Sequence, residues 1–162
     1  MPSIIDLSKR SRIKVSGKSA TEFLQNLCTN DANGLKSGSG LRAAFLDRFG
    51  KVLAVSSIYN LGEWFLVESD LLAHTKLLKY LTEKASFANC KIEDLKAKYR
   101  MFSVVGLEGQ ILGIEMKENQ IIKKNFNSIE ILVARNCFID RIDFFVPVEN
   151  ADGFEEFLFV KE

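Results

Sequence analysis

The chain has 162 residues, of which 47% are hydrophobic, and this length fits one globular domain over residues 1–162. It carries 22 Lys and Arg against 21 Asp and Glu, so no strong positive field favours a nucleic-acid or membrane partner. No apolar run approaches the roughly 20 residues that cross a bilayer, and the N-terminus lacks the apolar core of a signal peptide. We therefore expect a cytoplasmic protein that is folded almost throughout.

Local patterns in the first half of the chain predict alternating strands and helices. A polar loop at residues 30–40 is expected to lead into a β-hairpin, whose turn is formed by Asp47-Arg48-Phe49-Gly50. Strands are expected at residues 4–15 and 64–68, and the hairpin is expected to cover residues 41–59. Helices are expected at residues 19–28 and 71–85. Ser19 and Glu22 are expected to form a capping box at the start of the first helix.

The second half repeats this alternation without a visible sequence repeat. Its expected strands cover residues 90–94, 99–105, 129–134 and 138–148, and its expected helices cover residues 107–115 and 151–159, the latter capped by Asn150. Strand pairs separated by single helices indicate an α+β domain with helices on one sheet face, built as two similar halves.

Few residues in this sequence have the pattern of a catalytic or metal site. The single histidine, His74, excludes sites that need two imidazoles, and its place on the apolar side of a helix favours a structural role. The three cysteines, Cys28, Cys90 and Cys137, are too widely spaced for a CxxC motif, so we expect reduced thiols and no metal site. No P-loop, GxGxxG or GxSxG motif occurs, which excludes nucleotide binding by the first two motifs.

The hairpin turn offers the clearest candidate for ligand binding. Asp47 and Lys51 flank Gly50, so a carboxylate and an ammonium could face the same small molecule. Charged turn residues are also common simply because turns are solvated, and this plain interpretation is the stronger one from the residues alone.

Three runs together resemble a known family: IKVSG at residues 13–17, ATEFLQNLCTND at 20–31 and GLRAAFLDRFGKVL at 40–53. They are similar to the folate-binding domain shared by YgfZ-like proteins and the glycine cleavage T protein. The similarity covers about residues 7–149, and Arg135 to Pro147 resembles a degraded form of the family segment R-x-G-Y-T-G-E-x-G-F-E-I-x-V-P. The resemblance implies an α+β fold of two interlocked ferredoxin-like halves.

The resemblance also separates the two branches of the family. T proteins carry an aspartate pair that serves aminomethyl transfer, and Ala54 and Val55 stand at the matching positions here. Gly50-Lys51 instead resembles the G-K of YgfZ, a factor that uses folate in the maintenance of iron-sulfur enzymes. The YgfZ signature K-G-C-Y-x-G-Q-E does not occur, and Asp140 matches the pterin-holding glutamate of T proteins only across a gap.

Three hypotheses follow from this resemblance. The first is a YgfZ-like module that binds tetrahydrofolate without catalysis of its own, in iron-sulfur protein maintenance or one-carbon metabolism. The second is an aminomethyltransferase-like enzyme that uses Asp47 as a displaced acid. The third is a ligand-free assembly domain that binds a protein partner or itself through surface that further family domains would cover. For the folate site we predict Asp47, Lys51, Ser56, Tyr59, Arg135 and Asp140.

Overall fold

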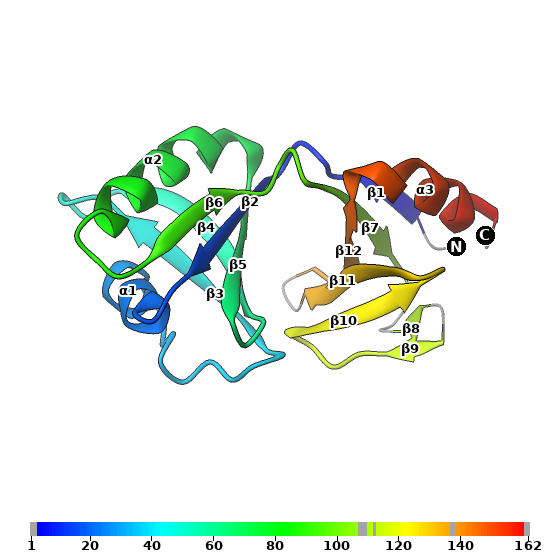
Figure 1. The fold of residues 1–162 in the computed structure, drawn as a ribbon, viewed down its shortest axis with the longest axis horizontal. Helices are drawn as coiled ribbons and strands as arrows, with labels where there is room; N and C mark the ends of the chain where they lie inside the picture. The colour runs from blue at the N-terminus through cyan, green and yellow to red at the C-terminus, as the bar shows by residue number, and fades with distance from the viewer. Residues whose placement is uncertain (1–2, 107–109, 112, 137–138, 161–162) are drawn as a thin grey trace. The chain divides into compact units, whose positions relative to one another are not determined.

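A computed structural model describes residues 3–106, 110–111, 113–136 and 139–160 of the chain. The chain divides into two compact units (Figure 1). The continuous unit comprises Arg10–Leu95, and the split unit comprises Met1–Lys9 together with Lys96–Glu162. Each unit contains one five-stranded antiparallel sheet and its own hydrophobic core. The single domain over residues 1–162 stays a prediction.

The continuous unit packs two helices on one face of its sheet. Its strands occur in the order β3-β4-β5-β2-β6. The elements are β2 (Ser11–Ser16), α1 (Ala20–Leu27), β3 (Gly40–Leu46), β4 (Val52–Asn60), β5 (Trp64–Ser69), α2 (His74–Ala85) and β6 (Lys91–Asp94). A single 3-10 turn, Leu71–Ala73, precedes α2 and is capped by the Asp70 side chain.

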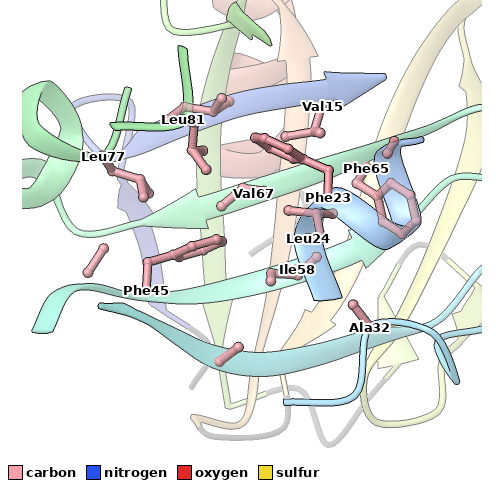
Figure 2. Close-up of a cluster of buried hydrophobic side chains, with 14 of the residues drawn as sticks. Val15, Phe23, Leu24, Ala32, Phe45, Ile58, Phe65, Val67, Leu77 and Leu81 are labelled. Carbon is pink, nitrogen blue, oxygen red and sulfur yellow. The ribbon is translucent and has the colours of Figure 1, made fainter. Parts of the chain in front are cut away.

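The core of the continuous unit lies between these helices and the sheet, and Figure 2 shows its side chains. Phe23 and Leu24 come from α1, and Leu77 and Leu81 come from α2. On the strands the residues of this core alternate, as Ile13 and Val15 do, because successive side chains of a strand point to opposite faces. The other face of the sheet is therefore the one without helices.

The split unit takes its first strand from the start of the chain. Its strands occur in the order β1-β7-β12-β11-β10, and all neighbours are antiparallel. The elements are β1 (Ser3–Asp6), β7 (Tyr99–Val105), β8 (Gln110–Ile111), β9 (Ile114–Glu115), β10 (Gln120–Phe126), β11 (Ile129–Asn136), β12 (Arg141–Pro147) and α3 (Ala151–Val160). Phe154 and Leu158 of α3 pack into the core of this unit.

The two sheets share one topology. Read from the edge, β3-β4-β5-β2-β6 corresponds strand for strand to β10-β11-β12-β7-β1. Without β3, the continuous unit is a β-α-β-β-α-β fold of the ferredoxin-like type. In the split unit α3 corresponds to α2, the β8-β9 hairpin replaces the first helix, and β1 supplies the last strand from the opposite end of the chain. The predicted α+β fold of two interlocked ferredoxin-like halves is confirmed.

Four local predictions require correction. The predicted strand at 4–15 is two strands, because β1 pairs with β7 while β2 pairs with β5 and β6. The predicted helix at 107–115 is wrong where the structure describes it, since β8 and β9 flank Gly113, whose φ of 72° ends any helix. Strand β10 was not predicted. The Ser19 side chain makes no capping hydrogen bond to α1, so the predicted capping box does not form.

Among the residues that the structure describes, no helix is both long enough and apolar enough to span a membrane.

Candidate functional site

The hairpin turn between β3 and β4 is held by the carboxylate of Asp47. Its Oδ1 atom accepts hydrogen bonds from the backbone N–H groups of Phe49 at 2.8 Å and Lys51 at 2.9 Å. Gly50 adopts a φ of 77°, a left-handed conformation that glycine takes without strain. The hydrogen bond from the Lys51 N–H is the main cause that holds the pKa of Asp47 below its usual value. The carboxylate therefore stays charged and shapes the turn.

Two residues of α2 add to this turn, and neither was predicted as a site residue. Partial burial, followed by the negative charge of Asp47, raises the pKa of the Tyr80 phenol. The Nζ atom of Lys84 lies 5.7 Å from the centre of the Tyr80 ring. The i, i+4 spacing of Tyr80 and Lys84 was the available sequence signal, because such pairs share one helix face. Tyr80 of α2 is therefore within electrostatic reach of the Asp47 carboxylate, and Lys84 lies beside the Tyr80 ring.

Ser56 and Tyr59, both predicted to bind folate, lie on opposite faces of β4. Ser56 is on the helix-covered face with Ala54 and Ile58, and its hydroxyl lies 2.6 Å from the Ser69 hydroxyl. Tyr59 is on the other face, and a Cβ atom at Gly40 would come within 2.4 Å of its ring. Both side chains are fully buried. One ligand on one face of the sheet cannot contact both.

Arg135 and Asp140 belong to the split unit and lie beside each other. Nη2 of Arg135 lies 3.3 Å from Oδ1 of Asp140, and Nη1 donates to the Met116 carbonyl at 2.8 Å. The Nε atom of Arg135 is buried and has no hydrogen-bond partner among the residues that the structure describes. The structure thus brings together Asp47 with Lys51, and Arg135 with Asp140, as two separate pairs in different units. Residues 137 and 138 between the second pair lie outside the described residues.

The positions of the T-protein aspartates carry no acid in this chain. Ala54 is 3% exposed and faces the core, whereas Val55 is 45% exposed on the opposite face of β4. Neither side chain can stabilise an ammonium ion or exchange a proton. A transfer reaction here would need its charge from elsewhere, and Asp47 is the nearest carboxylate in the hairpin.

Ser11, His74 and Asp94 form a hydrogen-bonded row that has the connectivity of a catalytic triad. The Ser11 hydroxyl lies 2.8 Å from Nδ1 of His74, and Nε2 lies 3.0 Å from Oδ2 of Asp94. Ser11, however, has no exposed surface, so no substrate can reach its oxygen. The row connects β2, α2 and β6 and so has a structural role. This agrees with the structural role that the sequence predicts for His74.

The cysteines show no sign of metal or redox chemistry among the residues that the structure describes. Cys28 donates a weak hydrogen bond to the Asn30 carbonyl at 3.3 Å, and burial raises the pKa of Cys90. Both are free thiols, and Cys137 lies outside the described residues. Over the described part of the chain, no three His, Cys, Asp or Glu side chains gather where they could hold a metal ion.

Sequence comparison relates the chain to aminomethyltransferases. Residues 2–137 match the family model described as the GCVT N-terminal domain. A probable aminomethyltransferase of Thermococcus kodakarensis is 26% identical over 166 residues, covering 93% of this chain and 42% of its own length. One from Aeropyrum pernix is 33% identical over 109 residues, covering 64% of this chain and 28% of its own. The chain thus spans less than half the length of these relatives.

Solved structures show the same fold. The glycine cleavage system aminomethyltransferase T from Bartonella henselae matches 96% of this chain and 44% of its own with a TM-score of 0.83 at 19% identity. A heterotetrameric sarcosine oxidase from a Corynebacterium species matches 93% of this chain with a TM-score of 0.64 at 13% identity. At these identities the likeness concerns the fold alone.

Proposed function

Because this chain belongs to the GCVT N-terminal domain family, we propose that it binds tetrahydrofolate and does not itself catalyse aminomethyl transfer. The observation on which the proposal rests is that Ala54 and Val55 have no acidic side chain, whereas the neighbouring turn has the charged residues Asp47 and Lys51. A transferase must stabilise a developing positive charge at the amine, and two apolar side chains supply no such stabilisation. Binding of the cofactor makes no such demand.

The hairpin turn has groups that suit a reduced folate. A folate carries a carboxylate tail, which an exposed ammonium such as Lys51 or Lys84 can pair with. The Tyr80 ring offers an aromatic surface next to Lys84. Asp47 contributes less to a ligand, because its Oδ1 atom already accepts two backbone hydrogen bonds. Lys51 is therefore the predicted site residue of this turn with the most to offer a ligand.

The biological role that we propose is YgfZ-like support of iron-sulfur enzymes. It rests on the Gly50-Lys51 step that resembles YgfZ. The turn itself requires Gly50, because the φ of this residue is 77°. Lys51 is therefore the residue of this step that distinguishes the YgfZ branch from the T-protein branch. Deletion of the gene is expected to lower the activity of iron-sulfur enzymes, and a Lys51→Ala copy is expected to restore less of this activity than a wild-type copy.

Calorimetric titration of the full chain with tetrahydrofolate under reducing conditions tests the binding proposal. We expect saturable heat and a rise in melting temperature, because a ligand that binds the native state stabilises it. Lys51→Gln is expected to weaken binding, while Lys36→Gln in the preceding loop serves as a matched control. Absence of both heat and thermal shift at millimolar ligand overturns the proposal.

An aminomethyltransferase is the second candidate, and the similarity to probable aminomethyltransferases favours it. Asp47 would then replace the missing aspartates. Its lowered pKa suits a charge that stabilises an ammonium ion better than a base that takes up a proton. This candidate predicts turnover of a methylamine-loaded lipoyl carrier that disappears in Asp47→Asn, where the side-chain oxygen of the turn is retained. Turnover that survives the substitution removes Asp47 from this role.

A further inference from the structure

A cavity of the split unit lies on the face of its sheet that packs against α3. Its volume is about 420 Å³, which falls in the range of small-molecule sites. It is lined by Ile114 of β9, residues 124–127 at the end of β10, Ile131 of β11 and Phe157 of α3. The β8-β9 hairpin, which contributes Ile114, replaces the first helix of the continuous unit at this point of the fold.

The walls of this cavity are aromatic and aliphatic. The ring centroids of Phe126 and Phe157 lie 4.4 Å apart, and the ring planes are inclined by 58°. Both side chains are half-buried, so each leaves part of its surface for a ligand. Ile114 and Ile131 belong to the core of the unit. A third ring can pack against the two phenylalanines at the centroid distances of about 4.5–7 Å that aromatic pairs favour.

Lys124 is the charged residue of the lining, and no acid lines the cavity among the residues that the structure describes. Lys124 is exposed and makes no ion pair with any other described residue, whereas Lys123, on the opposite face of β10, lies 3.6 Å from Glu130. Asn125 and Asn127 add amide groups that can donate hydrogen bonds. The cavity therefore suits an anion at one end of an apolar body.

A neighbouring cavity of about 260 Å³ has the opposite electrostatic character. It shares Phe126, Asn127 and Ile131 with the larger cavity and lies at the N-terminal half of α3. Its charged lining residue is Glu149, whose carboxylate repels an anion. An anionic group that enters this part of the unit is therefore favoured at Lys124.

We propose that the cavity between β10 and α3 binds a small aromatic monocarboxylate. The aromatic body lies against Phe126 and Phe157, and the carboxylate accepts a charge-assisted hydrogen bond from Lys124. None of the six residues predicted for the folate site lines this cavity. The site thus gives the protein a second ligand, which the proposed function does not include.

Titration of the full chain with 2-naphthoate, followed by ligand-observed NMR, tests the charge. Lys124→Gln removes the cation, and Lys123→Gln removes the same charge from the opposite face of β10 as a matched control. We expect Lys124→Gln to raise Kd about fivefold, the size of one exposed ion pair, and Lys123→Gln to change it less than about twofold. Equal effects of the two variants overturn the proposal, as does the absence of binding to the wild type at millimolar 2-naphthoate.

The aromatic class of the ligand is tested by a second pair of variants. Phe157→Leu removes one ring and keeps an apolar side chain, and Phe159→Leu, at a residue of α3 that is 56% exposed and does not line the cavity, is its control. We expect 2-naphthoate to bind less tightly to Phe157→Leu only, with circular dichroism confirming that both variants are folded. Octanoate, a carboxylate without a ring, should bind the wild type less tightly than 2-naphthoate, and tighter binding of octanoate overturns the aromatic class.

Competition distinguishes this site from folate binding. Tetrahydrofolate at high concentration should leave the Kd of 2-naphthoate unchanged, and this result is expected whether or not the proposed function holds. Displacement of 2-naphthoate by tetrahydrofolate would show that the two ligands share one site and would overturn the assignment of a second ligand.

Discussion

Arg100 on β7 donates a hydrogen bond from Nη2 to Oδ2 of Asp6 on β1 at 2.9 Å, across 94 positions of sequence. The same guanidinium donates to Asp152 at 2.8 Å and to Glu155 at 3.0 Å, both on α3. One arginine therefore connects three elements of the split unit, and it supports the short strand that comes from the far end of the chain.

Asp6→Asn is expected to loosen β1 and to remove part of the pH dependence of stability. Partial burial acts to raise the pKa of Asp6, but hydrogen bonds from Ser8 and Arg100 outweigh it, so the pKa is lowered. A carboxyl with a lowered folded-state pKa stabilises the fold above its unfolded pKa, near 3.9, and this stability is lost as pH falls through the folded value. The pair is half exposed, so the loss at neutral pH is at most about 1 kcal/mol.

Urea unfolding of wild type and Asp6→Asn between pH 2 and 7 measures this effect. The two curves of unfolding free energy should converge at the acid end and be fully separated above about pH 4. A constant difference across the whole range would show that the Asp6 carboxylate charge is not responsible.

Gly50→Ala and Gly153→Ala are expected to change the free energy of unfolding in opposite directions. A Cβ atom at either position meets no other atom within 4 Å, so space does not distinguish them. Gly50 has a φ of 77°, and we expect alanine there to cost about 1 kcal/mol. Gly153 lies within α3, where alanine should stabilise by roughly 0.5 kcal/mol. Chemical denaturation of both variants measures the signs, and equal effects would contradict the argument from φ.

Ser11→Ala is expected to lower the free energy of unfolding by about 1–3 kcal/mol, because it leaves Nδ1 of buried His74 without its partner. Asp94→Asn should cost less, since the amide oxygen can still accept from Nε2 and residue 94 is partly exposed. Urea unfolding measures both. A fluorophosphonate probe should leave Ser11 unlabelled in the folded protein, and rapid labelling there would contradict the structural role.

Ala54→Asp and Val55→Asp test what restoring the T-protein acids would do to the fold. Ala54 is 3% exposed, so an aspartate there buries an unpaired charge and should cost more than about 2 kcal/mol. Val55 is 45% exposed, and its substitution should change stability much less. Thermal melts at pH 7 measure the difference. Equal stability of the two variants would show that the faces of β4 are assigned wrongly.

Self-association through surface that further family domains would cover stays a prediction, and the exposed apolar residues of the hairpin are the place where we now test it. Phe49 is 72% exposed and Val52 is 61% exposed, and such neighbouring apolar residues favour contact with a partner. Light scattering at high concentration should show an increase in mass that Phe49→Ser reduces and Leu72→Ser, a control in the 3-10 turn before α2, does not. A monomer at every concentration contradicts the prediction.

Features set by neighbouring residues could be predicted from the sequence. The Asp47–Gly50 turn follows from local chemistry, because an aspartate accepts from nearby N–H groups and a glycine takes the left-handed position. The stripe of α2 and the structural role of His74 were predictable for the same reason. Strand β10 was not, since it is an edge strand whose lysines and asparagine hide the alternation of a half-buried strand.

Features set by residues far apart in sequence could not be predicted. No pattern of neighbouring residues shows that the charge of Asp47 raises the pKa of Tyr80. Nor does such a pattern show that Ser56 and Tyr59 face opposite sides of a sheet that includes β2. The separation of Arg135 and Asp140 into another unit likewise depends on which strands pair. The overall fold could be predicted only from the resemblance to a family, because the family's fold specifies which strands pair. The separate elements do not show which strands pair.

The origin of β1 also determines the order in which the chain can fold during synthesis. Ser3 and its partner Val105 leave the ribosome with the whole of Arg10–Leu95 between them, so the continuous unit is complete before β1 has a neighbour. Through that interval residues 3–6 have no strand to pair with, so their backbone hydrogen-bonding groups stay exposed to water. This segment can therefore join its sheet only after translation has reached β7.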